Sequence, residues 1–216
     1  MALDFTYRLL TEKDLISIQR LQEAVCAALE NPEILQPLSE SELLHILKGR
    51  GAMLGIFVDS QLIAFRALLK PDVEEEEHLG IDVGAEDLSR VLYQEISNVH
   101  PEFRGHGLQK TMAKLIMQEA DLNAVDWICA TVMPYNIASL KDKFAQGMQI
   151  FALKYKYGGK LRYVFGKKLG VEVALTSEEV LVSMGDTEAQ QQLLANGYVG
   201  IGMQSSNGDW LVQYRK

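Results

Sequence analysis

Two glycines separated by one residue, Gly105 and Gly107, lie between a strand predicted over residues 91–99 and a helix predicted over residues 110–122. Glycine adopts positive φ angles readily and lets a ligand approach the main chain closely. The first N–H groups of a helix have no partners within it, and the helix dipole adds partial positive charge there. The pattern therefore predicts a loop that binds a pyrophosphate through main-chain N–H groups; a glycine turn that merely starts a helix is the alternative.

The spacing of these glycines excludes two common phosphate-binding loops. The G-x-x-x-x-G-K-[ST] pattern is absent from the segment, and G-x-G-x-x-G fails because Lys110 stands at its last position. The segment resembles instead the acyl-CoA loop of the GNAT superfamily of acyltransferases, Q/R-x-x-G-x-G/A, usually preceded by V-x-P-x-x-R. The matching residues are Val99, Pro101, Arg104 and Gly107, with Gln109 in place of the last Gly/Ala.

A second segment extends the resemblance to about residues 5–169. Residues 134–140 read Pro-Tyr-Asn-Ile-Ala-Ser-Leu and are followed by Gly147 and Met148, similar to the family's P-x-N-x-x-S/A-x…G-F segment. In the family, two central strands separate there and the pantetheine of CoA lies between them. The resemblance implies an α/β (α+β) fold with a mixed, mostly antiparallel sheet flanked by helices, acetyl-CoA as co-substrate and no metal. The residues it assigns to the cofactor are Val99, Arg104, Gly105, His106, Gly107, Leu108, Gln109, Lys110, Asn136 and Ser139.

The activity implied by the resemblance is direct transfer of an acetyl group from CoA to a primary amine of a small molecule or peptide. Such an amine is mostly protonated near neutral pH, so a general base must remove its proton. Glu95 is the candidate base. Strict alternation along the strand places Tyr93, Glu95, Ser97 and Val99 on one face, and Val99 is expected to face the cofactor. An exposed or salt-bridged strand residue is the alternative for Glu95.

The general acid is unknown. Many family members carry a tyrosine in the helix after the asparagine, but Lys143 stands at that position in this sequence. This departure and Gln109 favour a second hypothesis, a non-catalytic acyl-CoA-binding or regulatory module, whereas Glu95 favours the enzyme. His106 is expected to be an exposed loop residue, and Cys129 a buried structural thiol.

Composition limits the partners of the chain. Its 216 residues carry 29 acidic and 21 basic side chains and a net charge of −8, which argues against nucleic acid as a partner. The two cysteines are too few for a disulfide framework, so a cytoplasmic setting is expected. No apolar run reaches the ~18 residues that span a bilayer, so we expect no membrane partner. Residues 1–7 carry Asp4 and no apolar h-region, so we expect no signal peptide.

The expected element order is β-α-α-β-β-β-α-β-α-β-β for residues 1–169, which we predict to be the GNAT-like acyltransferase domain. A small β-α-β-β extension over residues 170–216 is predicted to pack on that domain or on a second subunit, as in a homodimer. Residues 72–84 contain four consecutive glutamates and are expected to form a solvated loop. That expectation outweighs a metal site at Glu77, His78 and Asp82.

Overall fold

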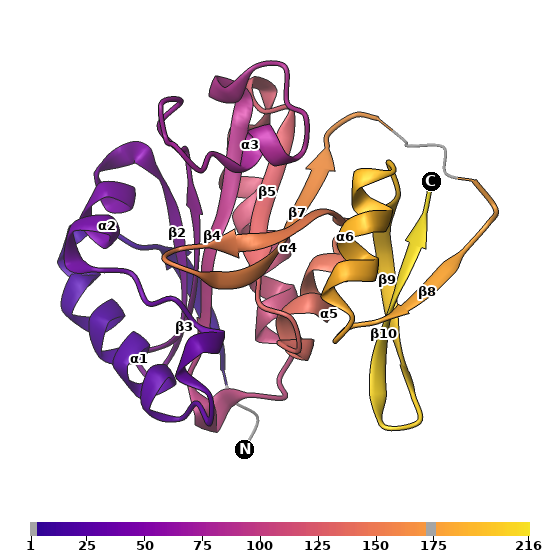
Figure 1. The fold of residues 1–216 in the computed structure, drawn as a ribbon. Helices are drawn as coiled ribbons and strands as arrows, with labels where there is room; N and C mark the ends of the chain where they lie inside the picture. Colours follow the sequence, from indigo (N-terminus) through magenta and orange to yellow (C-terminus); the bar gives the residue numbers. More distant parts are fainter. Residues whose placement is uncertain (1–3, 172–175) are drawn as a thin grey trace. The chain divides into compact units, whose positions relative to one another are not determined.

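The computed structural model describes residues 4–171 and 176–216, and the chain divides into two compact units. Unit 1 comprises residues 1–71 and 92–124, and unit 2 comprises residues 72–91 and 125–216. Each unit contains antiparallel strands flanked by helices, so the α+β class expected from the sequence is confirmed (Figure 1). The domain boundary predicted at residue 169 stays a prediction.

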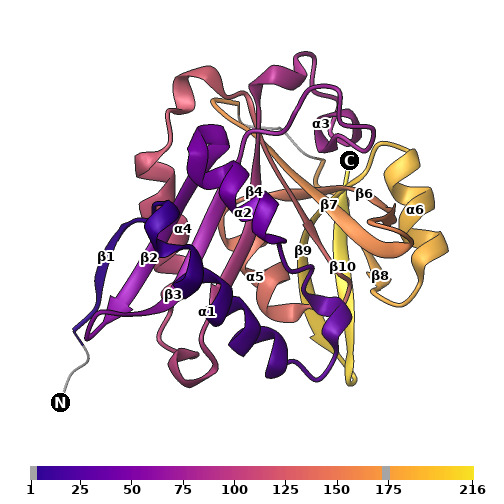
Figure 2. The same cartoon turned by 90° about the vertical axis from the view of Figure 1, so that its left-hand side faces the viewer.

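In unit 1 the strands are hydrogen-bonded in the order β1-β2-β3-β4, and each neighbouring pair is antiparallel. Helices α1 and α2 cover one face of these strands, and α4 packs on β2 and β3 from the other (Figure 2). The elements are β1 (Thr6–Leu9), α1 (Leu15–Ala27), α2 (Glu40–His45), β2 (Gly51–Val58), β3 (Gln61–Leu69), β4 (Val91–Val99) and α4 (Leu108–Glu119).

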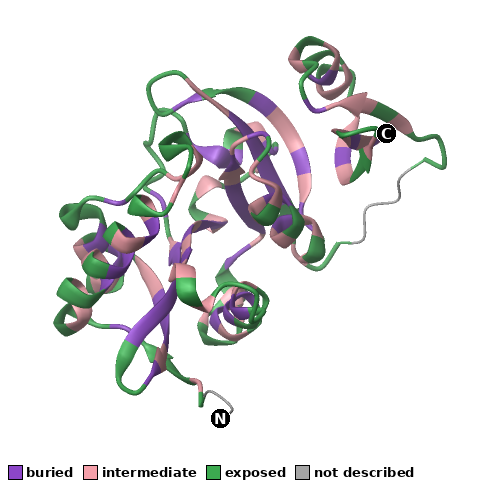
Figure 3. Ribbon diagram, turned by 90° about the horizontal axis from the view of Figure 1, so that it is seen from below, coloured by how far each residue is buried: buried purple, intermediate pink, exposed green. Residues whose placement is uncertain are grey.

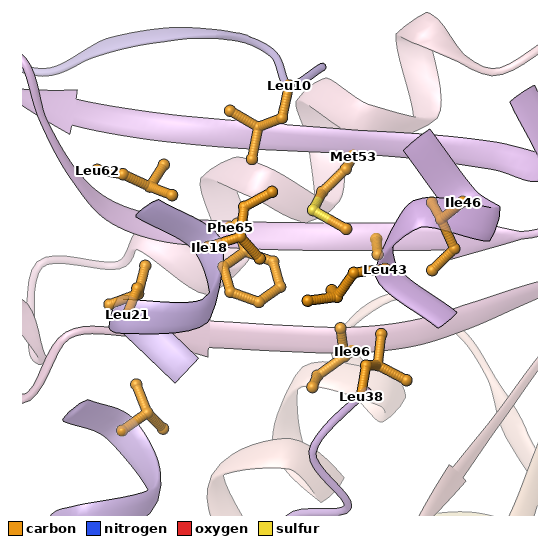
Figure 4. Packing of buried hydrophobic residues seen from close by; sticks show 12 residues of the cluster. Leu10, Ile18, Leu21, Leu38, Leu43, Ile46, Met53, Leu62, Phe65 and Ile96 are labelled. Carbon is orange, nitrogen blue, oxygen red and sulfur yellow. The ribbon is translucent and has the colours of Figure 1, made fainter. Parts of the chain in front are cut away.

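The core of unit 1 lies between α1, α2 and the strands. The helix α2 begins after Ser39, whose side chain and that of Glu42 form a capping box. Leu43 of α2 and Ile46, the first residue after it, are buried against the sheet. Figure 4 shows these side chains beside Met53 and Phe65 from the strands. Burying side chains of this size contributes about 1.5–3 kcal/mol each, which fixes α1 and α2 on this face.

A β-bulge interrupts the pairing of β3 with β4. Ala67 pairs with Ile96 and Leu68 pairs with Gln94, so Glu95 is an extra residue in β4. Residues directly opposite one another in an antiparallel pair share a face, and the bulge shifts the alternation of β4 by one residue. The face of β4 presented to α1 and α2 therefore changes at Glu95.

In unit 2 the strands are hydrogen-bonded in the order β5-β7-β6-β9-β10-β8. A turn at Gly158-Gly159 joins β6 to β7, and Asp186 caps α6 by accepting a hydrogen bond from the Ala189 N–H. In Figure 3 the buried residues are concentrated in the strands. The elements are α3 (Leu79–Asp82), β5 (Trp127–Val132), α5 (Ile137–Ala145), β6 (Gln149–Lys156), β7 (Lys160–Lys168), β8 (Val180–Ser183), α6 (Thr187–Ala195), β9 (Val199–Ser206) and β10 (Asp209–Arg215).

Single-turn segments connect these elements. They are the 3-10 helices Glu12–Asp14, Pro32–Ile34, Leu88–Arg90, Pro101–Phe103 and Leu122–Ala124, and a π-helical turn at Ile46–Arg50.

The fully buried side chain of Gln190 in α6 hydrogen-bonds to residues of β7, β10 and the end of β8. The Oε1 atom of Gln190 accepts hydrogen bonds from the hydroxyls of Tyr163 and Tyr214, at 2.7 and 2.9 Å. Its Nε2 atom donates to the carbonyls of Ser183 and Met184, at 3.2 and 3.0 Å, at the end of β8. One side chain thus satisfies buried polar groups from β7, β10 and β8.

Replacing Gln190 by leucine leaves several of these groups buried without partners, and each costs about 1–3 kcal/mol. We expect the Gln190→Leu variant to lose about 3 kcal/mol or more of unfolding free energy. Both tryptophans of the chain, Trp127 and Trp210, lie in unit 2, so urea unfolding followed by their fluorescence reports on this unit. The control is the exposed Gln192→Leu, which changes stability by about 0.5 kcal/mol or less. Equal losses in the two variants contradict the central role of Gln190.

The expectation of a wholly solvated loop over residues 72–84 is wrong at its end. The four glutamates are exposed as expected, but His78 is 1% exposed and the side chain of Asp82 is 4% exposed. Asp82 is ion-paired with Lys154 and Lys156, and the Lys156 ammonium also donates to the carbonyl of Glu77 at 3.0 Å. Paired charges allow this burial, because each carboxylate or ammonium keeps an oppositely charged partner.

Candidate functional site

The loop between β4 and α4 has the backbone conformation that an anion-binding turn requires. Gly105 has φ 83°, and Gly107, the residue that precedes the first helical residue Leu108, has φ 70°. A Cβ built on either glycine finds no heavy atom within 4 Å, so the space above the main chain is open. A phosphate can therefore approach the N–H groups at the start of α4, where the helix dipole favours negative charge.

The side chains of this loop hold its shape and leave it accessible. Arg104, His106 and Lys110 are exposed, whereas Leu108 is buried and anchors the start of α4. The Nδ1 atom of His106 lies 3.2 Å from the carbonyl oxygens of both Phe103 and Arg104, inside the turn. His106 is thus an exposed loop residue, as expected, and its ring contacts the main chain of its own loop.

A buried arginine that the sequence pattern does not single out lies beneath this loop. Arg66 of β3 is 1% exposed. Its Nη1 atom donates to the main-chain carbonyl of Gln109 at 3.4 Å, and its Nη2 atom donates to Oε1 of Gln94 in β4 at 2.6 Å. The only sequence signal is an arginine inside the otherwise apolar run of residues 62–69.

Glu95 lines a pocket of about 260 Å³ in unit 1. The carboxylate at the β4 bulge and that of Glu42 give the pocket acidic character, and His45 stands at its wall. Oε2 of Glu42 already accepts hydrogen bonds from the N–H and hydroxyl of Ser39, at 2.7 and 2.6 Å, so its position is fixed by the helix cap. The other lining residues are Leu38, Ser41, Ile46 and Leu69.

The prediction that Glu95, Ser97 and Val99 share one face is wrong. Val99 pairs with Ala64 and Ser97 with Arg66, on the face toward α4, whereas Glu95 lines the pocket beside α2. The bulge is the physical reason, because it places an extra residue in β4 between Gln94 and Ile96. The candidate base and the residue expected to face the cofactor therefore lie on opposite faces of β4.

Asn136 and Ser139 lie at the start of α5 in unit 2, and the loop residues lie in unit 1. Asn136 caps α5, since its side-chain oxygen accepts from the N–H of Ser139 at 3.3 Å. Tyr135 precedes this cap with φ 65°, and its hydroxyl donates to Asp209 of β10 at 3.4 Å. Burial and the nearby Asp209 carboxylate raise the pKa of Tyr135, so this phenol stays protonated at neutral pH.

Lys143 and Cys129, the residues at the expected general-acid position and in β5, are both buried in unit 2. Lys143, at the position of the family's tyrosine, is 7% exposed and its ammonium lies 3.5 Å from the Asp142 carboxylate. Cys129 is fully buried in β5, and this burial raises the pKa of its thiol to about 12. A thiol in this state is not a nucleophile near neutral pH, in agreement with the structural role expected for it.

Residues 4–171 and 176–216 contain neither a metal-binding cluster nor a membrane-spanning helix. They hold no group of three or more His, Cys, Asp or Glu side chains arranged to bind a metal ion. Within the same ranges, every helix is too short or too polar to cross a lipid bilayer.

Comparison by sequence gives no relatives: no family model and no curated protein matches the chain. Solved structures do match. The ribosomal-protein-S18-alanine N-acetyltransferase from Escherichia coli has a TM-score of 0.55 and 14% identity, over 79% of this chain and 97% of that chain. An acetyltransferase of the GNAT family from Streptococcus pneumoniae has a TM-score of 0.55 and 15% identity, over 77% and 100%.

A third match includes a bound cofactor. The PaiA N-acetyltransferase from Thermoplasma acidophilum, solved in complex with coenzyme A, has a TM-score of 0.54 and 17% identity, over 77% of this chain and 99% of that chain. At these identities the likeness concerns the fold. The fold of this chain is therefore that of the GNAT acetyltransferases, as the two sequence motifs predict.

Proposed function

We propose that this chain is a GNAT-type N-acetyltransferase that transfers an acetyl group from acetyl-CoA to a primary amine by direct attack in a ternary complex. The observation that carries the proposal is the start of α4, where the open, left-handed Gly105 and Gly107 lead into unpaired helix N–H groups. The fold supports it, because the matching structures are named as acetyltransferases and one was solved with coenzyme A.

The residues at this loop fit a CoA diphosphate. The main-chain N–H groups of residues 105–110 would donate hydrogen bonds to it, and the exposed side chains of Arg104 and Lys110 would add positive charge. Gln109 is half-buried, and its main-chain N–H remains available at the second helical position. Bound there, acetyl-CoA supplies the activated acetyl thioester. The main chain near Val99 would polarise the thioester carbonyl.

The amine is proposed to enter the pocket at Glu95. Its volume of about 260 Å³ suits a small amine or the end of a peptide, and its carboxylates attract an ammonium group. Because Glu95 lies on the α2 face of β4, opposite the Val99 side chain, it would accept through water the proton that the ammonium must lose before attack. A peptide acceptor is included because the matching Escherichia coli enzyme is named for an alanine of ribosomal protein S18.

A non-catalytic acyl-CoA-binding or regulatory module is the second candidate. The observation that favours it is the buried, ion-paired Lys143 at the position where the family's tyrosine acid stands. Gln109, in place of the last Gly/Ala of the acyl-CoA loop pattern, also favours the non-catalytic module. Both candidates bind CoA at the start of α4, so they agree in binding and differ in turnover.

Isothermal titration with CoA and a turnover assay together decide between them. We expect the protein to bind CoA and to release free thiol from acetyl-CoA when incubated with at least one member of a panel of aliphatic, aromatic and peptide amines. Binding without turnover on any amine supports the module and overturns the enzyme. Absence of CoA binding overturns both. We propose the same cytoplasmic setting and lack of a nucleic-acid partner as the sequence suggests, and a homodimer remains part of the proposal.

A further inference from the structure

Arg66, which belongs to none of the sequence motifs, lies buried beneath the loop of the proposed CoA site. Arg66 lies at the centre of β3, paired with Ser97 of β4, on the face that α4 covers. Burying a guanidinium in a protein interior is costly unless polar groups meet it. Here the side chain bridges two elements, because it donates to Gln94 of β4 and to the carbonyl of Gln109 in the first turn of α4.

We propose that Arg66 is a positioning residue for the CoA diphosphate. This rests on the proposed function, because it assumes that the diphosphate binds at the start of α4. The contact with the Gln109 carbonyl fixes the first turn of α4 against β3, and the orientation of the loop N–H groups depends on that turn. The guanidinium also places a permanent positive charge beneath the turn, where water screens it little.

Two substitutions separate the hydrogen bonds of Arg66 from its positive charge. Lysine keeps the charge but loses the fork that reaches Gln94 and Gln109 together, whereas methionine loses both. Arg66→Met removes the donor to Oε1 of Gln94 and is expected to cost about 1–3 kcal/mol of unfolding free energy, and Arg66→Lys is the second variant in case the methionine variant unfolds. Circular dichroism and thermal unfolding check this in both variants.

The experiment measures the affinity of each variant for CoA and for pantetheine by titration calorimetry. Pantetheine lacks the diphosphate and the nucleotide, so a positioning role at the diphosphate affects CoA alone. We expect Arg66→Met to weaken CoA binding about 10- to 100-fold, Arg66→Lys to weaken it less, and both to leave pantetheine binding within about twofold. Arg162→Met is the matched control, because Arg162 is a 3% exposed arginine of β7 in unit 2.

The results that overturn the inference can be told apart. If the Arg66 variants bind CoA as the wild type does, Arg66 does not act on the site. If CoA and pantetheine binding fall together, or if Arg162→Met weakens CoA as much, the role of Arg66 is structural only. If wild-type protein binds pantetheine but gains nothing from the diphosphate of CoA, or fails to bind CoA, the proposed site at α4 is itself wrong.

Discussion

Replacing Glu95 by glutamine is expected to lower kcat by about 10²- to 10⁴-fold, the usual contribution of a general base. Glutamine has nearly the same shape but cannot accept the proton of an ammonium group. Glu95 lines the pocket beside α2 and lies on the face of β4 opposite Val99, so the affinity for CoA should stay within about twofold. Steady-state kinetics and CoA titration on the same preparation give both values.

The pH dependence sharpens this test. A primary amine becomes neutral without help only as the pH approaches about 10, so the deficit of Glu95→Gln should shrink as the pH rises. The control is Glu23→Gln, which removes an exposed carboxylate from α1 and should leave kcat unchanged. A rate for Glu95→Gln equal to that of the wild type removes Glu95 from the mechanism, and a deficit that is constant with pH contradicts its role as a base.

Replacing Gly107 by alanine is expected to weaken CoA binding about 10- to 100-fold, which corresponds to the loss of one charge-assisted hydrogen bond. The residue has φ 70°, a conformation that costs an L-residue about 1–2 kcal/mol. The added methyl group meets no protein atom within 4 Å, so it occupies the space that we assign to the phosphates. Titration with CoA measures the effect.

Gly158 provides a closely matched control for this substitution. It has φ 75°, and a Cβ there also finds no heavy atom within 4 Å, but it lies in the turn between β6 and β7. Gly158→Ala should therefore carry the same backbone strain and leave CoA binding unchanged. Equal CoA affinities for Gly107→Ala and Gly158→Ala would show that the loop before α4 does not contact the phosphates.

Local sequence signals predicted those features that depend on neighbouring residues. The conformation of the glycines before α4 and the exposure of the four consecutive glutamates follow from preferences that act within a few residues. Their positions in the structure match because no distant partner is needed to specify them. The fold followed from the order of these local elements together with the two motifs.

The features that were missed depend on distant partners. The bulge at Glu95 arises from the register of β4 against β3, so alternation counted along β4 alone gives the wrong face. The side chain of Asp82 is buried with Lys154 and Lys156, more than seventy residues later, as its charged partners. Arg66 is likewise buried where it donates hydrogen bonds to Gln94 and to the carbonyl of Gln109. Residue type and spacing do not encode such pairings.

The buried position of Gln190 also constrains the order in which the chain can fold during synthesis. The last residue of unit 1 is residue 124, so all of its core is available while later residues are still being added. Unit 2 differs, because the partners of the Gln190 side chain include Tyr163 and Tyr214. In the nascent chain, the buried hydrogen bonds of Gln190 therefore stay incomplete until Tyr214 has been made. We expect chaperones to protect β6 and β7 during this interval.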